Sequence, residues 1–415
     1  MTQETQSAPQ LDRADTRMRH DAGLSGALRG FTDRVRSGDL GMLPVVVGLL
    51  LISVVFSTLN PIVLAPNNLV NLLFDAAAVG FISLGVVCVL LLGEIDLSIG
   101  SMSGLASAIT GVLWVNMGIP LPVTILAVLV SGALVGLLYG FLRNRFEMPS
   151  FVATLAGLLA LLGMQLYILG PTGSINMPFT SALVRFGQIM IMPAWLSYLV
   201  AVIPGALLVI GGIRTNQRRT AANLSSSGMS VTVVKAVSLT AALVFAVFYL
   251  GQGRGVPWMF GVFVLFVMIL DYALTRTQWG RSMFAVGGNA EAARRSGINV
   301  QRIRLSAFVV CSTFAALGGV FAAARLASAS QQAGTGDVNL NAIAAAVIGG
   351  TSLFGGRGSA WSALLGVLVI MAISNGLTLL NLSSSLRYMI TGAVLAIAVI
   401  VDSLARRSRA SHGRA

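Results

Sequence analysis

Long apolar runs, separated by short polar connections, dominate this chain. An apolar run of about 20 residues is long enough to cross the hydrocarbon core of a membrane as an α-helix. The alternation of apolar and polar residues typical of a membrane β-barrel is missing. The pattern therefore predicts an all-α polytopic membrane protein, with candidate spans at about 42–60, 69–92, 97–117, 121–142, 150–170, 193–213, 236–252, 258–275, 305–325, 341–356, 359–380 and 388–402.

Two of these runs are short. The run 341–356 ends in glycine pairs, which indicates a half-helix that returns rather than crosses. The run 388–402 is the other short one. Losing only one of them would put the basic C-terminal tail outside, so ten or twelve crossings are expected rather than eleven.

Both ends of the chain are polar. Residues 1–41 carry six arginines and six acids, too many acids for a signal peptide. Within them, Leu24, Leu28, Phe31 and Val35 recur at helical spacing, typical of a short helix on the membrane surface; a structureless tail with chance periodicity is the alternative. Residues 405–415 form a basic tail, and we assign residues 42–404 to one transmembrane domain.

The charge distribution predicts that both termini are cytoplasmic. Apolar residues make up 56% of the 415 and charged residues only 10%, against about 25% charged in soluble domains. With the N-terminus inside, 23 of the 27 basic residues fall on the cytoplasmic side, including those of the connection 214–235. We therefore attribute the net charge of +13 to basic residues that fix the orientation of the chain in the membrane. A nucleic-acid-binding surface is not expected, because the arginines are dispersed between the spans.

The residue inventory argues against an enzyme. Lys235, the only lysine, follows Val234, so the chain holds no Gly-Lys-Ser/Thr phosphate-binding loop. The two histidines fall in the polar ends, and Cys88 and Cys311 lie inside apolar runs as small hydrophobic residues. We expect no catalytic residues, no metal site and no cofactor. If ATP drives this protein, another polypeptide hydrolyses it.

Two acids interrupt the apolar pattern near residue 95. Glu94 and Asp96 cost about 2.5 to 3.5 kcal/mol each at the centre of a lipid-facing helix, so they must lie at an interface, line a cavity or break the helix. Gly93 precedes them, and Asp96 and Ser98 are candidate N-caps, so one helix should end and another begin here. One interpretation is a segment that lines or gates a translocation path. The other is that Asp96 caps a helix and Glu94 is a turn residue near the membrane surface.

A second polar, glycine-rich segment spans residues 328–341. Asp337, Asn339 and Asn341 precede an alanine-rich run whose small residues permit close helix packing. Asp96 and Asp337 each stand before a small-residue helix, and the two helices run in opposite directions, so an inverted repeat is possible. Asp337, Asn339 and Asn341 join Glu94, Asp96 and Ser98 as candidates for translocation or gating.

The connection 280–303 predicts one short isolated helix. Gly287 and Gly288 break the chain, Asn289 can cap, and the good helix formers 290–295 follow before Gly297 ends the helix. A two-turn helix in water is marginal, so something must receive it. A partner subunit is one candidate, and the protein's own membrane surface is the other.

Three of these segments carry a resemblance to a known family. They are residues 94–101 (Glu-Ile-Asp-Leu-Ser-Ile-Gly-Ser), 287–300 and 340–359. In this order they resemble the permease subunits of bacterial ATP-binding cassette importers for ribose, xylose, arabinose and galactose, and the similarity runs from about residue 44 to 404. Residues 149–157, the basic insert 214–235 and residues 254–257 resemble the D-xylose branch. Asn339-Leu-Asn341 stands where Glu-Leu-Asp is common in the family, so a role of acids at that site is not carried over to this chain.

The resemblance implies a homodimeric channel unit, multi-pass in the bacterial inner membrane and surrounded by lipid. An extracytoplasmic binding protein would deliver a monosaccharide, D-xylose or another pentose, and a separate ATP-hydrolysing subunit would dock under the helix around Glu291. The coupling residues it implies are Gly287, Gly288, Asn289, Glu291, Ala292, Ala293, Arg294 and Gly297.

Two rivals remain open at this point. A proton- or sodium-coupled secondary transporter would use Glu94, Asp96 or Asp271 as its ion-linked group. A membrane scaffold without transport fits poorly with broken helices and buried acids.

Overall fold

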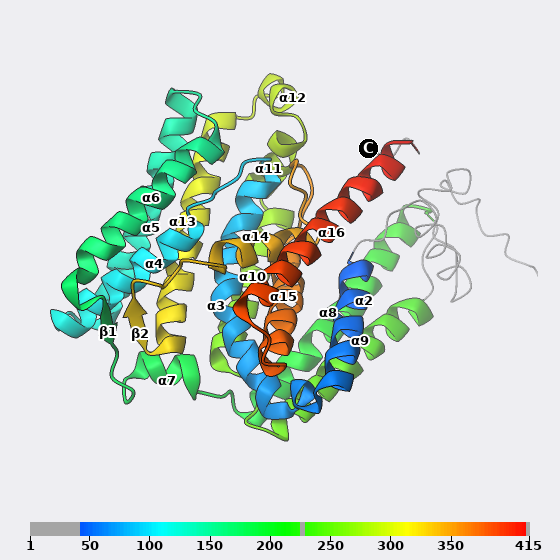
Figure 1. Ribbon diagram of the computed structural model, residues 1–415. Helices are drawn as coiled ribbons and strands as arrows, with labels where there is room; N and C mark the ends of the chain where they lie inside the picture. Colours follow the sequence, from blue (N-terminus) through cyan, green and yellow to red (C-terminus); the bar gives the residue numbers. More distant parts are fainter. Residues whose placement is uncertain (1–41, 225–228, 412–415) are drawn as a thin grey trace, which may run out of the picture. The chain divides into compact units, whose positions relative to one another are not determined.

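A computed structural model describes residues 42–224 and 229–411 of the chain. The predicted surface helix within residues 1–41 and the last four residues of the basic tail lie outside the described residues. The described residues are mostly helical, with two short strands, which confirms the all-α polytopic class (Figure 1). They form two compact units, residues 192–255 with 405–411 and residues 42–191 with 256–404, and each unit is considered by itself.

In the described part of the chain, nine helical segments are long and apolar enough to cross a membrane. They are α3 (Pro66–Leu91), α4 (Ile99–Thr110) with the π-helical turn Gly111–Asn116, α5 (Leu121–Arg145), α6 (Ser150–Leu169) with the turn Gly170–Thr172, α8 (Ala194–Ala221), α9 (Met229–Gly251), α10 (Trp258–Arg276), α13 (Val300–Leu326) and α15 (Ala360–Leu379).

Shorter helices and two strands complete the described fold. These are α2 (Leu43–Leu59), the turn Pro61–Leu64, α7 (Ala182–Gln188), α11 (Gln278–Gly288), α12 (Ala290–Arg295), α14 (Val338–Ile348), β1 (Ser174–Asn176) and β2 (Ser328–Ser330). The doubtful run 388–402 falls inside α16 (Ser384–Ser411), a helix of 28 residues.

The centre of the larger unit is the packing of α13 against α3, α4 and α5. Small residues make this packing close: a Cβ added at Gly85 would lie 2.6 Å from the carbonyl oxygen of Cys311, and one at Gly136 would lie 2.4 Å from that of Phe308. In lipid, where burial of apolar surface between helices gains little, close backbone approach is a main source of helix association. These helices hold the site residues described below.

The predicted half-helix is confirmed as a short helix. α14 has 11 residues, about 16 Å, roughly half the hydrocarbon thickness. It ends at Ile348, and the chain then turns through Gly349 to Ser359 before α15 begins. α14 packs against α15 and α3.

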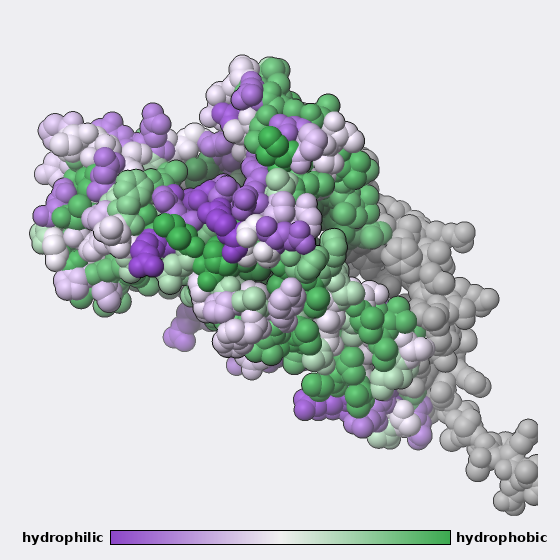
Figure 2. Space-filling model, turned by 90° about the horizontal axis from the view of Figure 1, so that it is seen from below, coloured by the Kyte–Doolittle hydropathy of each residue, from purple (hydrophilic) through white to green (hydrophobic). Residues whose placement is uncertain are grey.

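A two-stranded ribbon lies at the end of the larger unit away from α12 (Figure 1). β1 and β2 pair antiparallel, with Ser174 opposite Ser330, and the exposed Gln331 and Gln332 follow directly. The sequence did not predict these strands, because three residues are too few for a period-two pattern. Figure 2, viewed from below, shows hydrophilic side chains gathered on part of the face with hydrophobic ones beside them.

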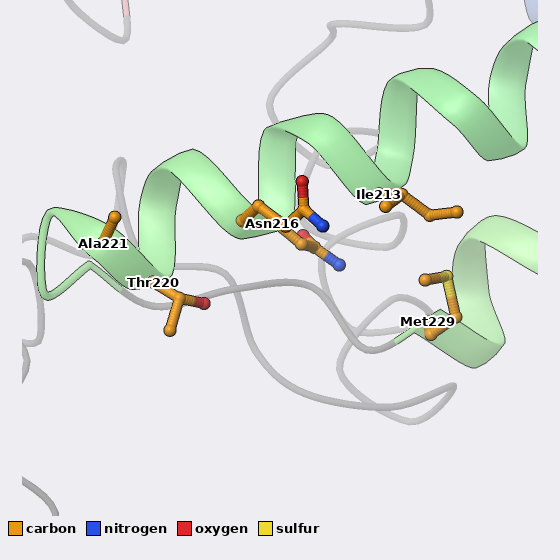
Figure 3. A pocket seen from close by; sticks show the side chains of 6 residues that line it. Ile213, Asn216, Thr220, Ala221 and Met229 are labelled. Atoms are coloured by element: carbon orange, nitrogen blue, oxygen red, sulfur yellow. The ribbon is translucent and has the colours of Figure 1, made fainter.

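The smaller unit is a helical hairpin of α8 and α9. α8 continues to Ala221, eight residues beyond the predicted span, so Arg214, Arg218 and Arg219 are helical rather than part of a loop. Helical hydrogen bonds persist outside the hydrocarbon, and arginines near a helix C-terminus interact favourably with its dipole. A pocket of about 570 Å³ lies at this end of the hairpin, where Asn216 of α8 and Met229 of α9 are drawn in Figure 3; it is lined by Ile213, Asn216, Gln217, Thr220, Ala221 and Met229. None of these residues is a predicted site residue.

Candidate translocation and coupling elements

The first broken segment is the connection between α3 and α4. α3 ends at Leu91, Gly93 takes a φ of +71°, and α4 begins at Ile99, as the sequence predicts. The non-helical backbone is held by α6: Ile95 N–H donates to Ser150 Oγ at 3.2 Å and Leu97 N–H donates to Thr154 Oγ1 at 3.1 Å. Backbone at membrane depth needs such protein partners because lipid offers none.

Glu94 joins three parts of the fold. Its Oε1 lies 2.9 Å from Arg143 Nε at the end of α5 and 3.3 Å from Arg304 Nε near the start of α13. The Glu94 side chain is 8% exposed, and the two arginine side chains are 22% and 24% exposed. The carboxylate of Glu94 thus forms ion pairs with two guanidinium groups from different helices. This geometry agrees with the interpretation of Glu94 as a turn residue and adds a role in fixing α5 and α13.

Asp96 is buried with hydrogen-bonding neighbours. Its Oδ1 accepts from Ser98 N–H at 2.8 Å and from Ser98 Oγ–H at 2.7 Å, and the Cys311 thiol donates to Oδ2 at 3.8 Å. Both carboxylate oxygens of this buried side chain therefore have partners within the fold.

Ser98 occupies the N-cap position of α4, as the sequence predicts. Its hydroxyl donates to Asp96 and makes no cap bond. Asp96 satisfies a free N–H at this helix start instead, two residues earlier in the chain.

The second broken segment meets the first. Asn339 Nδ2–H donates to the Leu97 carbonyl at 2.6 Å, and Asp337 Oδ2 accepts from Asn341 Nδ2–H at 3.1 Å. A Cβ added at Gly100 would lie 2.5 Å from the Gly334 carbonyl oxygen, so α4 packs directly on the glycine-rich segment. The structure therefore brings Asn339 next to the Asp96 segment, while Asp337 bonds within its own helix start.

The coupling segment contains the predicted isolated helix. Asn289 Oδ1 accepts from Ala292 N–H at 2.9 Å, α12 covers Ala290–Arg295, and Gly297 takes a φ of +84°. The Asn289 cap and the glycine stop are thus confirmed. α12 projects at one end of the larger unit (Figure 1), and Glu291 on it forms ion pairs with Arg294 and Arg295, all three exposed.

One prediction about this segment is wrong. Gly287 and Gly288 do not break the chain, because they form the last residues of α11 and the break comes at Asn289. At Gly287 the reason for glycine is space, since an added Cβ would lie 1.8 Å from the Leu91 carbonyl oxygen. Of the two alanines among the implied coupling residues, Ala293 is 5% exposed and Ala292 is exposed.

Sequence reasoning missed several polar contacts. Asp75 Oδ1 lies 2.7 Å from Arg325 Nε, and the Arg325 guanidinium lies over the Phe74 ring at 5.3 Å from its centroid. Gln165 Nε2 donates to the carbonyls of Ser330 and Ala333, both at 2.9 Å. A lone acid in the apolar run of α3 and a lone glutamine in that of α6 were the available signals.

Comparison with known proteins places the chain in a family. Residues 68–399 match the family described as branched-chain amino acid transport system / permease component. The xylose transport system permease protein of Escherichia coli (strain K12) is 38% identical over 83% of this chain and 86% of its own length. That of Haemophilus influenzae (strain ATCC 51907 / DSM 11121 / KW20 / Rd) is 36% identical over 82% and 90%.

A ribose permease is also similar. The ribose import permease protein of Escherichia coli (strain K12) is 31% identical over 86% of this chain and 92% of its own length. No solved structure matches the chain. The resemblance found in the three sequence segments is confirmed. With its nine apolar helices in the described residues, the chain is a multi-pass inner-membrane protein and belongs to this family of transport-system permease components.

Proposed function

We propose that the chain is the membrane-spanning subunit of an ATP-driven monosaccharide importer, with D-xylose or another pentose as cargo. The observation that carries the proposal is α12: a capped two-turn helix that projects from the fold with Glu291, Arg294 and Arg295 exposed. A helix this short is unstable alone, so a receiving surface on an ATP-hydrolysing subunit accounts for it. The names of the xylose and ribose permeases at 31% to 38% identity support the substrate class.

The same proposal includes an orientation and further partners. Arg143, Arg276 and Arg304 lie at or near helix ends that lead toward the α12 side, which the positive-inside rule assigns to the cytoplasm. The opposite end, with Gln331 and Gln332, would receive an extracytoplasmic sugar-binding protein. A second copy of the chain completes the channel, as the family resemblance implies.

The contacts of Glu94 and Asp96 support structural roles rather than the ion-linked role that the alternative would give them. Glu94 is ion-paired with two arginines, and Asp96 is buried with Ser98 and Cys311 as partners. Asp271, the third candidate, is partly buried on α10.

Reconstitution tests the proposal. The chain is placed in proteoliposomes alone, with the ATP-hydrolysing subunit, and with that subunit plus binding protein, and uptake of labelled D-xylose, ribose and galactose is measured. We expect xylose uptake only in the complete, ATP-supplied system. Uptake by the chain alone under a proton or sodium gradient would establish the alternative, and ATP-driven uptake of ribose or galactose without xylose would reassign the cargo.

A further inference from the structure

Three segments far apart in the sequence meet at one backbone junction in the larger unit. The Gly356 N–H donates to the Leu91 carbonyl at 2.9 Å. Around this bond, a Cβ added at Gly287 would lie 1.8 Å from the Leu91 carbonyl oxygen and 2.7 Å from Gly356 N. A Cβ at Gly355 would lie 2.8 Å from the Gly287 carbonyl oxygen and 2.9 Å from Gly93 N. We call Gly93, Gly287, Gly355 and Gly356 the glycine junction.

Each of the three segments that meet at the junction leads from it to a candidate site. From Gly287 the chain passes through Gly288 to Asn289 and then into α12. From Gly93 it passes at once to Glu94 and Asp96. Gly355 and Gly356 lie in the turn that follows α14, whose other end holds Asn339. The exposed helix and the buried acids are therefore separated by a backbone contact and not by a flexible linker.

The contact leaves no room for an added side chain at Gly287. Real Cβ atoms do not approach other atoms closer than 3.0 Å, so any side chain at Gly287 must push Leu91 away by more than about 1 Å. Glu94, three residues further on, is held by Arg143 and Arg304 and cannot follow freely. A displacement at α11 must therefore appear as a displacement or a broken contact in the segment 91–96.

We propose that Gly287 is a positioning residue of the coupling mechanism: through the glycine junction it transmits the movement of α12 to the segment that carries Glu94 and Asp96. This inference rests on the proposed function, because it is the docked ATP-hydrolysing subunit that moves α12. The alternative is that the junction only stabilises the fold.

Two other glycines serve as controls that distinguish a coupling role of the glycine junction from a purely stabilising one. Gly366 of α15 is as crowded as Gly287, because an added Cβ would lie 1.7 Å from the Ala345 carbonyl oxygen in α14, and it is not part of the glycine junction. Gly163 of α6 has nothing within 4 Å of an added Cβ. Gly287→Ala, Gly366→Ala and Gly163→Ala thus compare a blocked junction, a blocked packing contact and an open position with the same chemical change.

The first experiment uses the complete transporter in proteoliposomes. For each variant we measure assembly with the ATP-hydrolysing subunit, basal ATP hydrolysis, and the stimulation of hydrolysis by sugar-loaded binding protein. Gly287→Ala should assemble but lose about fivefold or more of the stimulation, the lower range of coupling free energies between sites. Gly366→Ala should lower thermal stability while the stimulation per assembled complex stays normal, and Gly163→Ala should change neither.

Normal stimulation in Gly287→Ala, or an equal loss of stimulation in Gly366→Ala, overturns the inference while the proposed function stands. A wild-type complex that takes up no sugar overturns the proposed function and the inference with it.

A second experiment needs no variant and decides the case if Gly287→Ala does not fold. Hydrogen exchange is followed by mass spectrometry in the wild-type complex, without nucleotide and with ATP trapped on a non-hydrolysing ATP subunit. Peptides covering 89–96 and 352–358 should change their exchange together with peptides covering 285–298. A change confined to 285–298 overturns the inference.

Discussion

Arg143 Nε lies 2.9 Å from Glu94 Oε1, and this pair ties the end of α5 to the connection that follows α3. Arg304 Nε, 3.3 Å from the same oxygen, brings in α13. On α12, Glu291 also pairs with two arginines, but at the surface, with its side chain 50% exposed. The chain thus offers two acids with similar partners and different burial, and they should behave differently when changed.

Glu94→Gln should destabilise the protein. The substitution keeps the size of the side chain but leaves two partly buried guanidinium groups uncompensated, and we expect a loss of about 1 to 3 kcal/mol in the free energy of unfolding. Glu291→Gln, which breaks only exposed pairs, should cost less than about 1 kcal/mol. Unfolding of the purified chain in detergent measures both, and equal losses would contradict the structural role given to Glu94.

Glu291→Gln should instead impair coupling. Removing the charge from an exposed helix weakens a charge-assisted contact with the ATP-hydrolysing subunit, and ATP-driven sugar uptake should fall about fivefold or more while the permease still inserts normally. Glu147→Gln, at an exposed acid in the connection between α5 and α6, is the control and should transport normally. Unchanged uptake and ATP hydrolysis in Glu291→Gln would remove α12 from the coupling mechanism.

Asp96→Ala should destabilise the protein. The substitution removes the carboxylate that accepts from both Ser98 N–H and Ser98 Oγ–H, so two buried donors lose this acceptor, and we expect a loss of about 1 to 3 kcal/mol in the free energy of unfolding. Unfolding of the purified chain in detergent measures the loss, and unchanged stability would contradict this role of Asp96.

The proposed orientation can be tested with two single cysteines. Cys88 and Cys311 are both buried and free, so the wild-type background should react little with thiol reagents. Ala222→Cys, after α8, should be labelled in intact cells only by membrane-permeant reagents. Phe179 lies between β1 and α7 and is 70% exposed. Phe179→Cys should be labelled in intact cells also by reagents that cannot cross the membrane. The reverse pattern would invert the topology.

Local features of the coupling segment were predictable because neighbours in sequence determine them. Asn289 caps a helix whose first N–H groups lie three residues away, and Gly297 supplies a positive φ at a helix end. Gly287 was misread as a helix breaker because its reason lies in Leu91, nearly 200 residues earlier in the chain. A glycine needed for close approach looks the same in sequence as a glycine needed for a turn.

In the candidate site, too, features set by neighbouring residues could be predicted and contacts with distant residues could not. Hydropathy located the helices and two polar interruptions, one near residue 95 and one at residues 328–341, because polar groups are unfavourable in lipid and are therefore rare within membrane helices. It could not show that Glu94 pairs with Arg143 and Arg304, since those partners lie 49 and 210 positions away. The sequence therefore predicted where polar groups interrupt the membrane helices but not how they satisfy one another.

Gln165 gives the polar turn after β2 a fixed length. Its single amide group on α6 binds the carbonyls of Ser330 and Ala333, which a longer turn would carry out of reach. An insertion between those two residues would move at least one of these carbonyls away from the buried amide, which costs more than a typical loop insertion does. Relatives of this chain that lengthen the turn should therefore carry a smaller or apolar residue at the position of Gln165, so that the two sites change as a pair during evolution.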